Sequence, residues 1–327
     1  MSKLKVTDLV KRYGGGKNLL RQELPMVHAV RGVSLEVETG EILGIVGESG
    51  CGKSTLAKML VGLESPSEGR IVMDGVELSA PLKKINLKQL SQQVQYIFQD
   101  PNSSLNPRKT IREILSAPLK YLRGMDKTER EQRLNELMEK VNLRPEFLDR
   151  YPHEFSGGQA QRIGVARALA AEPDLLILDE PVSALDVSVQ AQVLNLLKAL
   201  RQEFSLTYLF ISHDLGVVRN FCDRVAVMYF GRIVERGTAD DIFRRPRHPY
   251  TQRLLDSVPG AAIERLPPES DAVILPDPYH PPKGCSFAPR CPFAQARCEQ
   301  ESPELTEMNP GHDAACYYPL DDDPTRD

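Results

Sequence analysis

The alternation of apolar and polar residues predicts two kinds of β structure in this chain. Residues 4–6 and 33–37 alternate in strand fashion, and an Asp-Gly pair within 73–78 is typical of a hairpin turn. Four short apolar runs are instead uninterrupted and are separated by helical patterns, namely EILGIVG, VQYIFQ, LLILDE and TYLFISHD. Continuous apolar runs favour parallel strands that are buried on both faces. We therefore expect an α/β fold with a mainly parallel sheet, helices on both of its faces and an antiparallel β subdomain.

Two further segments differ from this core in their pattern. Leu134, Leu137, Met138 and Val141 follow helical spacing, which predicts an inserted helical subdomain at about residues 100–160. After residue 237 prolines become frequent, and proline at this density excludes long helices. The expected organisation is a core domain over residues 1–240 and a loop-rich C-terminal extension over residues 241–327.

Composition and charge restrict the environment of the protein. Among 327 residues, 41 Lys and Arg face 45 Asp and Glu, so a net charge of −4 gives no attraction to nucleic acid, and we expect no nucleic-acid partner. The first residues lack the apolar segment of a signal peptide, and no apolar run approaches the roughly 20 residues that span a bilayer. We expect a cytosolic location, where the six cysteines stay reduced rather than forming structural disulfides.

The sequence GESGCGKST places a phosphate-binding loop between a predicted strand and a predicted helix. Its glycines let backbone N–H groups surround the β-phosphate of ATP, Lys53 reaches the β and γ oxygens, and Ser54 offers a hydroxyl to Mg²⁺. A simple glycine-rich turn is the alternative. This context predicts a P-loop NTPase (RecA-like) core. The residues expected to bind the phosphates are Gly47, Glu48, Ser49, Gly50, Cys51, Gly52, Lys53, Ser54 and Thr55.

Two acids follow the apolar run LLIL, at what would be the carboxyl end of a buried strand. Asp179 is expected to hold a magnesium-bound water, and Glu180 to polarise the water that attacks ATP. An apolar run that ends in two acids is common, but beside a phosphate loop it indicates nucleotide hydrolysis.

A second glycine-rich stretch, FSGGQAQR, opens another predicted helix at residues 155–162. The N-terminus of a helix attracts anions through its free N–H groups and its dipole. A helix cap alone would explain Ser156 but not the paired glycines.

Taken together, these motifs resemble the nucleotide-binding subunits of ABC transporters over about residues 4–240. The match departs from the usual LSGGQ signature only at Phe155, a position that packs rather than touching nucleotide. In that family two subunits associate head to tail, and the signature of each closes over the ATP held by its partner's phosphate loop. The resemblance assigns the signature role to Ser156, Gly157, Gly158 and Gln159.

The same resemblance implies roles for four more residues. Gln99 matches the residue that reaches Mg²⁺ or the attacking water, and His213 matches the histidine that contacts the γ-phosphate. Asp186 is expected at the dimer seam, and Tyr13 is expected to stack on adenine. Taken alone, His213 and Tyr13 would be ordinary strand-end residues. We therefore predict a competent ATPase with Glu180, His213 and Gln99 as catalytic residues and with Mg²⁺ held by Ser54, Gln99 and Asp179.

Two segments outside the catalytic motifs indicate a subclass. DPNSSLNPRKTIREIL (100–115) and RRPRHPYTQRLLDSVP (244–259) are similar to the ATP-binding subunits of bacterial dipeptide and oligopeptide importers, most of all to their second, F-type ATPase partner. This branch also includes nickel and glutathione importers, and soluble ABC ATPases of DNA repair or translation form a rival class. The resemblance implies two membrane permease subunits docked on the helical insertion, a sibling or identical ATPase partner, and an extracytoplasmic substrate-binding protein. It also implies a peripheral position on the cytoplasmic face of the inner membrane.

Four cysteines gather in the C-terminal extension, at Cys285, Cys291, Cys298 and Cys316. Four thiolates suit an iron–sulfur cluster or zinc, yet the spacing C-x5-C-x6-C-x17-C matches no common motif for either. Peptide-importer ATPases carry a [4Fe-4S] cluster on their C-terminal cysteines, and this resemblance favours iron. Four unconnected thiols remain the alternative, and an iron–sulfur regulator without hydrolysis is a further one. Cys51 and Cys222 are expected to be small space-filling residues.

Overall fold

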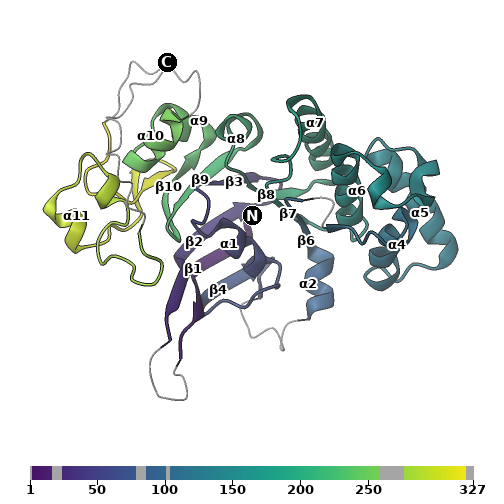
Figure 1. The fold of residues 1–327 in the computed structure, drawn as a ribbon, viewed down its shortest axis with the longest axis horizontal. Helices are drawn as coiled ribbons and strands as arrows, with labels where there is room; N and C mark the ends of the chain where they lie inside the picture. The colour runs from purple at the N-terminus through teal and green to yellow at the C-terminus, as the bar shows by residue number, and fades with distance from the viewer. Residues whose placement is uncertain (1, 17–23, 79–85, 101–103, 258–275, 322–327) are drawn as a thin grey trace.

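A computed structural model describes residues 2–16, 24–78, 86–100, 104–257 and 276–321 of the chain. Positions 101–103 and 258–259, which belong to the two segments that indicated the subclass, lie outside the described residues. The described fold contains two sheets with helices around them (Figure 1).

The smaller sheet is antiparallel, with the strand order β2-β1-β4-β5. It confirms the expected antiparallel β subdomain. The Asp-Gly pair that predicted a hairpin forms the turn between β4 and β5, where Asp74 has φ 47° and Gly75 φ 78°. The strands are β1 (Ser2–Gly14), β2 (Met26–Glu38), β4 (Glu68–Met73) and β5 (Val76–Glu77).

The larger sheet has the strand order β11-β12-β10-β9-β3-β8-β7-β6, and its strands from β9 to β6 are parallel. The four uninterrupted apolar runs form β3, β6, β7 and β8, so the predicted α/β fold with a mainly parallel sheet is confirmed. Three antiparallel strands extend the sheet beyond β9. The strands are β3 (Ile42–Val46), β6 (Val94–Ile97), β7 (Leu175–Asp179), β8 (Thr207–Ile211), β9 (Arg224–Tyr229), β10 (Arg232–Thr238), β11 (Thr306–Asn309) and β12 (His312–Ala314).

The C-terminal extension contributes structure as well as loops. Its strand β12 pairs with β10, and β11 pairs with β12, so the extension continues the main sheet. The sequence predicted only a loop-rich segment here. These strands have three and four residues, too few to show a periodic pattern.

The helices lie around the larger sheet, with α4, α5 and α6 at one end of the molecule and α11 at the other (Figure 1). Thr110 and Asp126 begin α4 and α5 with capping boxes, and Leu134, Leu137 and Met138 of α5 are buried as their spacing predicted. The helices are α1 (Lys53–Leu60), α2 (Leu87–Gln93), α4 (Ile111–Tyr121), α5 (Lys127–Lys140), α6 (Gly157–Leu169), α7 (Val187–Phe204), α8 (Leu215–Phe221), α9 (Ala239–Arg244), α10 (Pro249–Asp256) and α11 (Ala296–Gln300), with short 3₁₀ turns at Pro145–Asp149, Pro152–Glu154 and Ala288–Arg290.

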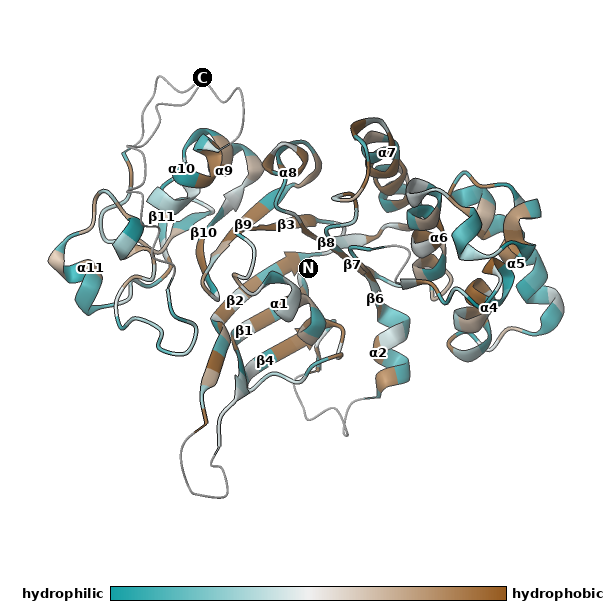
Figure 2. Ribbon diagram, viewed as in Figure 1, coloured by the Kyte–Doolittle hydropathy of each residue, from teal (hydrophilic) through white to brown (hydrophobic). Residues whose placement is uncertain are grey.

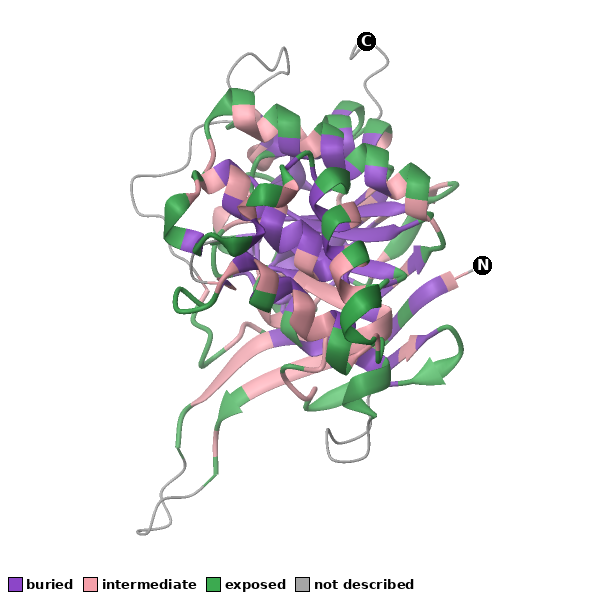
Figure 3. Ribbon diagram, turned by 90° about the vertical axis from the view of Figure 1, so that its right-hand side faces the viewer, coloured by how far each residue is buried: buried purple, intermediate pink, exposed green. Residues whose placement is uncertain are grey.

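Alternate residues of the parallel strands enter two separate hydrophobic cores. On β7, Leu176 and Leu178 join the core formed with α4 to α9, whereas Leu175 and Ile177 join the core formed with α1 and the antiparallel sheet. Burial on both faces explains why these runs are continuously apolar. The buried residues occupy the centre of the molecule (Figure 3), and its central strands are hydrophobic while α11 is hydrophilic (Figure 2).

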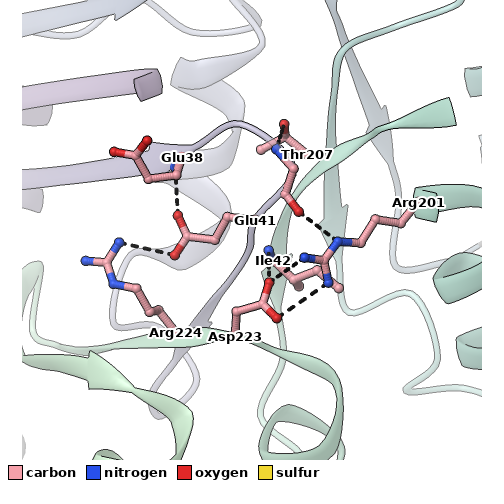
Figure 4. A network of polar contacts seen from close by, with 8 residues as sticks. Glu38, Glu41, Ile42, Arg201, Thr207, Asp223 and Arg224 are labelled. Carbon is pink, nitrogen blue, oxygen red and sulfur yellow. Dashed lines mark hydrogen bonds and ion pairs between the residues drawn. The ribbon is translucent and has the colours of Figure 1, made fainter. Parts of the chain in front are cut away.

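A polar network lies at the end of the larger sheet at which β3 and β9 begin (Figure 4). The Asp223 carboxylate accepts hydrogen bonds from the Ile42 N–H at 2.8 Å and from Arg201 at 2.7 Å. Nearby, the Glu41 carboxylate accepts a hydrogen bond from the Arg224 guanidinium at 3.1 Å. Charge-assisted bonds of this kind fix the position of β3, which leads directly into the predicted phosphate loop.

None of the helices in the described part of the chain combines the length and the apolar character needed to cross a membrane.

Candidate functional site

The predicted phosphate loop lies between β3 and α1 and is tightly packed at two glycines. A Cβ atom on Gly47 would lie 2.1 Å from the Met228 carbonyl oxygen, and one on Gly52 would lie 2.4 Å from the Ala29 carbonyl oxygen. Gly52 has φ 107° and caps α1 directly before Lys53. Any larger side chain would push the loop away from β9 and β2, so these glycines hold its shape.

The loop borders a cavity of about 490 Å³ at the carboxyl ends of the parallel strands. Ligands of open α/β sheets bind at the carboxyl ends of the strands. Nine predicted site residues line the cavity together with six residues that the sequence did not indicate. The predicted ones are Ser49, Gly50, Gly52, Lys53, Ser54, Thr55, Gln99, Glu180 and His213, and the others are Val27, His28, Ala29, Phe230, Gly231 and Pro278.

Lys53 is buried, with 6% of its surface exposed, and its ammonium group is directed at the loop itself. It donates to the carbonyl oxygens of Gly47 at 2.7 Å and of Glu48 at 3.0 Å. A buried ammonium with neutral acceptors at the edge of a cavity is well placed for an anion such as a phosphate.

The three predicted catalytic side chains meet at the Glu180 carboxylate. Its Oε2 accepts a hydrogen bond from Gln99 Nε2 at 2.8 Å and lies 3.1 Å from His213 Nδ1, although Gln99 is 81 positions away in the sequence. Glu180 has φ 48°, a left-handed conformation that is strained for a residue with a side chain. Strain of this kind is typical of functional sites, and Glu180 lines the same cavity as the phosphate loop.

Asp179 ends β7 and is 6% exposed. Its carboxylate accepts a hydrogen bond from the hydroxyl of Tyr96 on β6, whose pKa is raised by burial and by that bond. The sequence did not indicate Tyr96, because the contact joins neighbouring strands that are far apart in the chain. The Tyr96 hydroxyl fixes the direction of a carboxylate that is predicted to serve Mg²⁺.

The predicted signature lies elsewhere on the same chain. Ser156 caps α6, and its hydroxyl oxygen accepts a hydrogen bond from the Gln159 N–H. In return, the Ser156 N–H donates to the side-chain oxygen of Gln159 at 3.1 Å. A Cβ atom on Gly158 would lie 2.3 Å from the Val189 side chain, so close packing against α7 requires a glycine there. Phe155 packs edge to face on Phe147, at 5.9 Å between ring centroids. None of the residues Ser156–Gln159 lines the described cavity.

Tyr13 and Asp186 also lie outside the lining of this cavity. The Tyr13 hydroxyl bonds the Glu64 carboxylate, and the Lys11 ammonium lies 4.9 Å from the centre of the Tyr13 ring. Asp186 caps α7 by accepting the Val189 N–H at 3.0 Å, and that bond keeps its pKa below the usual value. Val187 beside it is 83% exposed, which gives this turn an apolar surface residue.

The four cysteines of the extension line one small apolar cavity of about 20 Å³. Burial raises the pKa of Cys291 to about 11 and that of Cys316 to about 12. Within the described ranges, no group of three or more His, Cys, Asp or Glu side chains is arranged to hold a metal ion. The donor set that the sequence predicted is gathered around one cavity, but its present geometry is not that of a metal site.

Two family models match the chain. The model described as "ABC transporter" matches residues 30–183, and the model described as "Oligopeptide/dipeptide transporter, C-terminal region" matches residues 234–298. The second match begins in β10 and continues through the first three cysteines of the extension.

Similar proteins and structures agree with these matches. The chain is 47% identical to the oligopeptide transport ATP-binding protein AppF of Bacillus subtilis over 96% of each chain. It is 46% identical to the di/tripeptide transport ATP-binding protein DppF of Pseudomonas aeruginosa, over 96% of this chain and 97% of the relative. Among solved structures, the dimeric ATP-binding cassette MJ0796 bound to ADP and Pi has a TM-score of 0.63 at 30% identity, covering 72% of this chain and 98% of its own. The cbiO1 protein of Clostridium perfringens has a TM-score of 0.63 at 27% identity, and the match covers 75% of this chain and 91% of the cbiO1 chain.

Proposed function

The chain belongs to the ATP-binding subunits of the oligopeptide and dipeptide ABC transporters, and from this membership we propose that its ATPase activity powers the uptake of short peptides. The observation that carries the proposal is the meeting of Gln99, Glu180 and His213 beside the phosphate loop. The matched C-terminal region favours peptides over the other cargoes of this transporter branch.

Hydrolysis follows from the positions of these groups. Glu180 accepts the proton of the attacking water, and Gln99 and His213 hold its carboxylate in place. Lys53 and the backbone N–H groups of residues 47–55 bind the β- and γ-phosphates. Ser54, Gln99 and Asp179 would hold Mg²⁺, which would neutralise charge on the transferred phosphoryl group.

A second protomer completes the site. Each chain presents the signature Ser156–Gln159 on a surface apart from its own nucleotide cavity. In the proposed assembly that helix N-terminus faces the γ-phosphate bound by the partner, whereas Asp186 lies at the seam. Bound ATP then stabilises the dimer, and hydrolysis releases it, because the nucleotide is part of the interface.

The remaining subunits follow from the transporter membership. We assign two membrane permease subunits to the surface of α4 and α5, a sibling ATPase as the second protomer, and an extracytoplasmic binding protein that delivers the peptide. The chain then lies on the cytoplasmic face of the inner membrane.

Transport by the reconstituted complex tests this proposal. The chain is co-expressed with its candidate permeases and second ATPase, and the complex is placed in proteoliposomes with the binding protein. We expect ATP-dependent accumulation of a labelled dipeptide that stops when Glu180→Gln replaces the parent chain. Accumulation of nickel or glutathione without peptide would contradict the peptide assignment.

The four cysteines support a second proposal, that they bind a [4Fe-4S] cluster, with zinc as the alternative. Their support is the common apolar cavity, which excludes water from four potential thiolate ligands. We expect protein purified without oxygen to show broad visible absorption and acid-labile sulfide, both lost in Cys291→Ser. Zinc without iron in that preparation would overturn the cluster.

A further inference from the structure

Glu48, the second residue of the phosphate loop, joins the loop to the C-terminal extension. Its backbone N–H donates to the Tyr250 hydroxyl at 2.8 Å, and its carboxylate accepts from both terminal nitrogens of Arg290, each at 2.8 Å. Its carbonyl oxygen accepts the Lys53 ammonium at 3.0 Å. One residue therefore contacts the phosphate-binding lysine on one side and two residues of the extension on the other.

The two partners from the extension are held firmly. Tyr250 is fully buried on α10, with its ring tilted against Tyr229 at 4.4 Å between centroids. The Arg290 side chain is 8% exposed, and its guanidinium lies 5.6 Å from the centre of the Phe287 ring. An ordered aromatic cluster thus fixes both groups that reach Glu48.

Arg290 also belongs to the turn that carries two of the four cysteines. The Ala288 N–H donates to the Cys285 carbonyl at 3.1 Å, and the Cys291 N–H donates to the Ala288 carbonyl at 3.2 Å. The backbone between Cys285 and Cys291 is therefore a closed turn with Arg290 next to its end. Arg290 therefore lies in the same turn as two of the cysteines that line the cavity.

A carboxylate in a phosphate loop needs such a partner. Glu48 places a negative charge within the loop that binds a triphosphate, and the side chain keeps 34% of its surface exposed. Like charges at short range repel, whereas a bidentate guanidinium neutralises the carboxylate and also fixes its direction. The bond to Glu48 raises the pKa of Arg290, whose guanidinium is charged at neutral pH in any case.

We propose that Arg290 and Tyr250 are positioning residues for the phosphate loop, so that the affinity for ATP depends on the C-terminal extension through Glu48. Neither side chain lines the nucleotide cavity, so both act through the loop. The proposal rests on the proposed ATP-binding site but not on the transported cargo or on the second protomer.

Equilibrium binding of a fluorescent ATP analogue tests this inference in the full-length chain, with Glu180→Gln as the parent so that no hydrolysis occurs. Arg290→Gln should weaken binding about tenfold, because it leaves the Glu48 charge uncompensated. The double variant Arg290→Gln with Glu48→Gln should regain most of that loss, since the repelling charge is gone. Tyr250→Phe, which removes only the hydroxyl, should weaken binding about fivefold.

Salt and a matched variant separate this effect from general destabilisation. Added salt should narrow the difference in affinity for the ATP analogue between Arg290→Gln and its parent, because salt screens the repulsion between the Glu48 carboxylate and the phosphates. Arg244→Gln removes an arginine of the same extension that is 46% exposed and pairs with Asp240, and this variant should bind the ATP analogue as the parent does. If Arg290→Gln does not fold, Arg290→Met, which keeps a long apolar side chain beside Phe287 but removes the charge, replaces it in the same cycle with Glu48→Gln.

Parental affinity in Arg290→Gln, or a double variant as weak as the single one, would overturn the inference. A parent chain that binds no ATP at all would instead contradict the proposed function.

Discussion

Glu180 is the residue that we propose as the base in ATP hydrolysis. Among the residues that line the described cavity, Glu180 alone carries a carboxylate, and both Gln99 and His213 contact it. The backbone of Glu180 is held in a left-handed conformation. A group held in this way is ready to orient a water molecule before ATP arrives.

Replacing Glu180 by Gln keeps the size of the side chain but removes its basicity. We expect ATP turnover to fall by about 100-fold or more, the usual contribution of a general base, while ATP binding is retained. Steady-state hydrolysis and nucleotide binding on the same preparation check both parts. Unchanged turnover would contradict the assignment of Glu180 as the base.

Tyr96 positions the carboxylate that is proposed to serve Mg²⁺. Tyr96→Phe removes the hydroxyl that bonds Asp179, and the loss of such an outer partner typically weakens metal affinity about tenfold. The Mg²⁺ concentration that gives half-maximal ATPase activity should rise accordingly. Tyr121→Phe, at a tyrosine that is 65% exposed, is the matched control, and equal behaviour of the two variants would contradict the role of Tyr96.

The sequence revealed site residues where the chemistry is local. The phosphate loop occupies nine consecutive positions, so its glycines, lysine and hydroxyl residues are visible together. Tyr96 contacts Asp179 through strand pairing, whereas Pro278 lines the cavity and Arg290 contacts the phosphate loop because the extension folds against the core. The sequence around these three residues contains no motif that predicts such contacts. The position of the signature relative to the cavity was likewise predicted from the family resemblance rather than from spacing.

At the scale of elements, one buried carboxylate on β10 links β12 and the start of α10 in the C-terminal extension to the rest of the main sheet. Glu235 on β10 is fully buried and accepts the N–H groups of Arg247 at 2.6 Å and His248 at 2.9 Å. It also lies 2.7 Å from His312 Nε2 on β12. These contacts hold β10, the start of α10 and β12 together, and α10 carries the tyrosine that reaches the phosphate loop.

Removing this carboxylate should destabilise the extension. Glu235→Ala leaves two buried N–H groups and His312 without their acceptor, which costs about 3 kcal/mol or more. Denaturant unfolding should show the loss, and limited proteolysis should release the extension earlier. Glu299→Ala, at an exposed acid of α11, should unfold like the parent, and equal stability of both variants would contradict the attachment.

The elements that the sequence predicted are those with long or repeated patterns. The parallel strands were visible because burial on both faces makes them continuously apolar, and α5 was visible because its apolar residues recur at helical spacing. The strands β11 and β12 were not, since they are short and stand in a proline-rich segment where pairing with β10 decides the conformation.

At the scale of the whole molecule, the nucleotide site and the cysteine cavity occupy different parts of one continuous sheet. The main sheet runs from β6, which leads to the proposed catalytic residue Gln99, to β11 in the extension. Strands β10 and β9 separate β12 of the extension from β3, which leads into the phosphate loop. The side chains of Tyr250 and Phe287 in the extension nevertheless contact Tyr229 on β9. In the proposed coupling, Arg290 and Tyr250 of the extension influence ATP binding through Glu48 without lining the cavity, whereas Pro278 of the same extension lines it directly.

The central claim is that ATP is held between two protomers, with the phosphate loop of one facing Ser156 of the other. Turnover per chain, measured as the protein is diluted in the presence of ATP, tests it most directly, with sedimentation reporting the fraction of dimer. We predict that turnover falls together with that fraction, or, if the second protomer is a sibling subunit, that hydrolysis begins only when the sibling is added. Constant turnover from a chain that sedimentation shows to be monomeric would contradict the account.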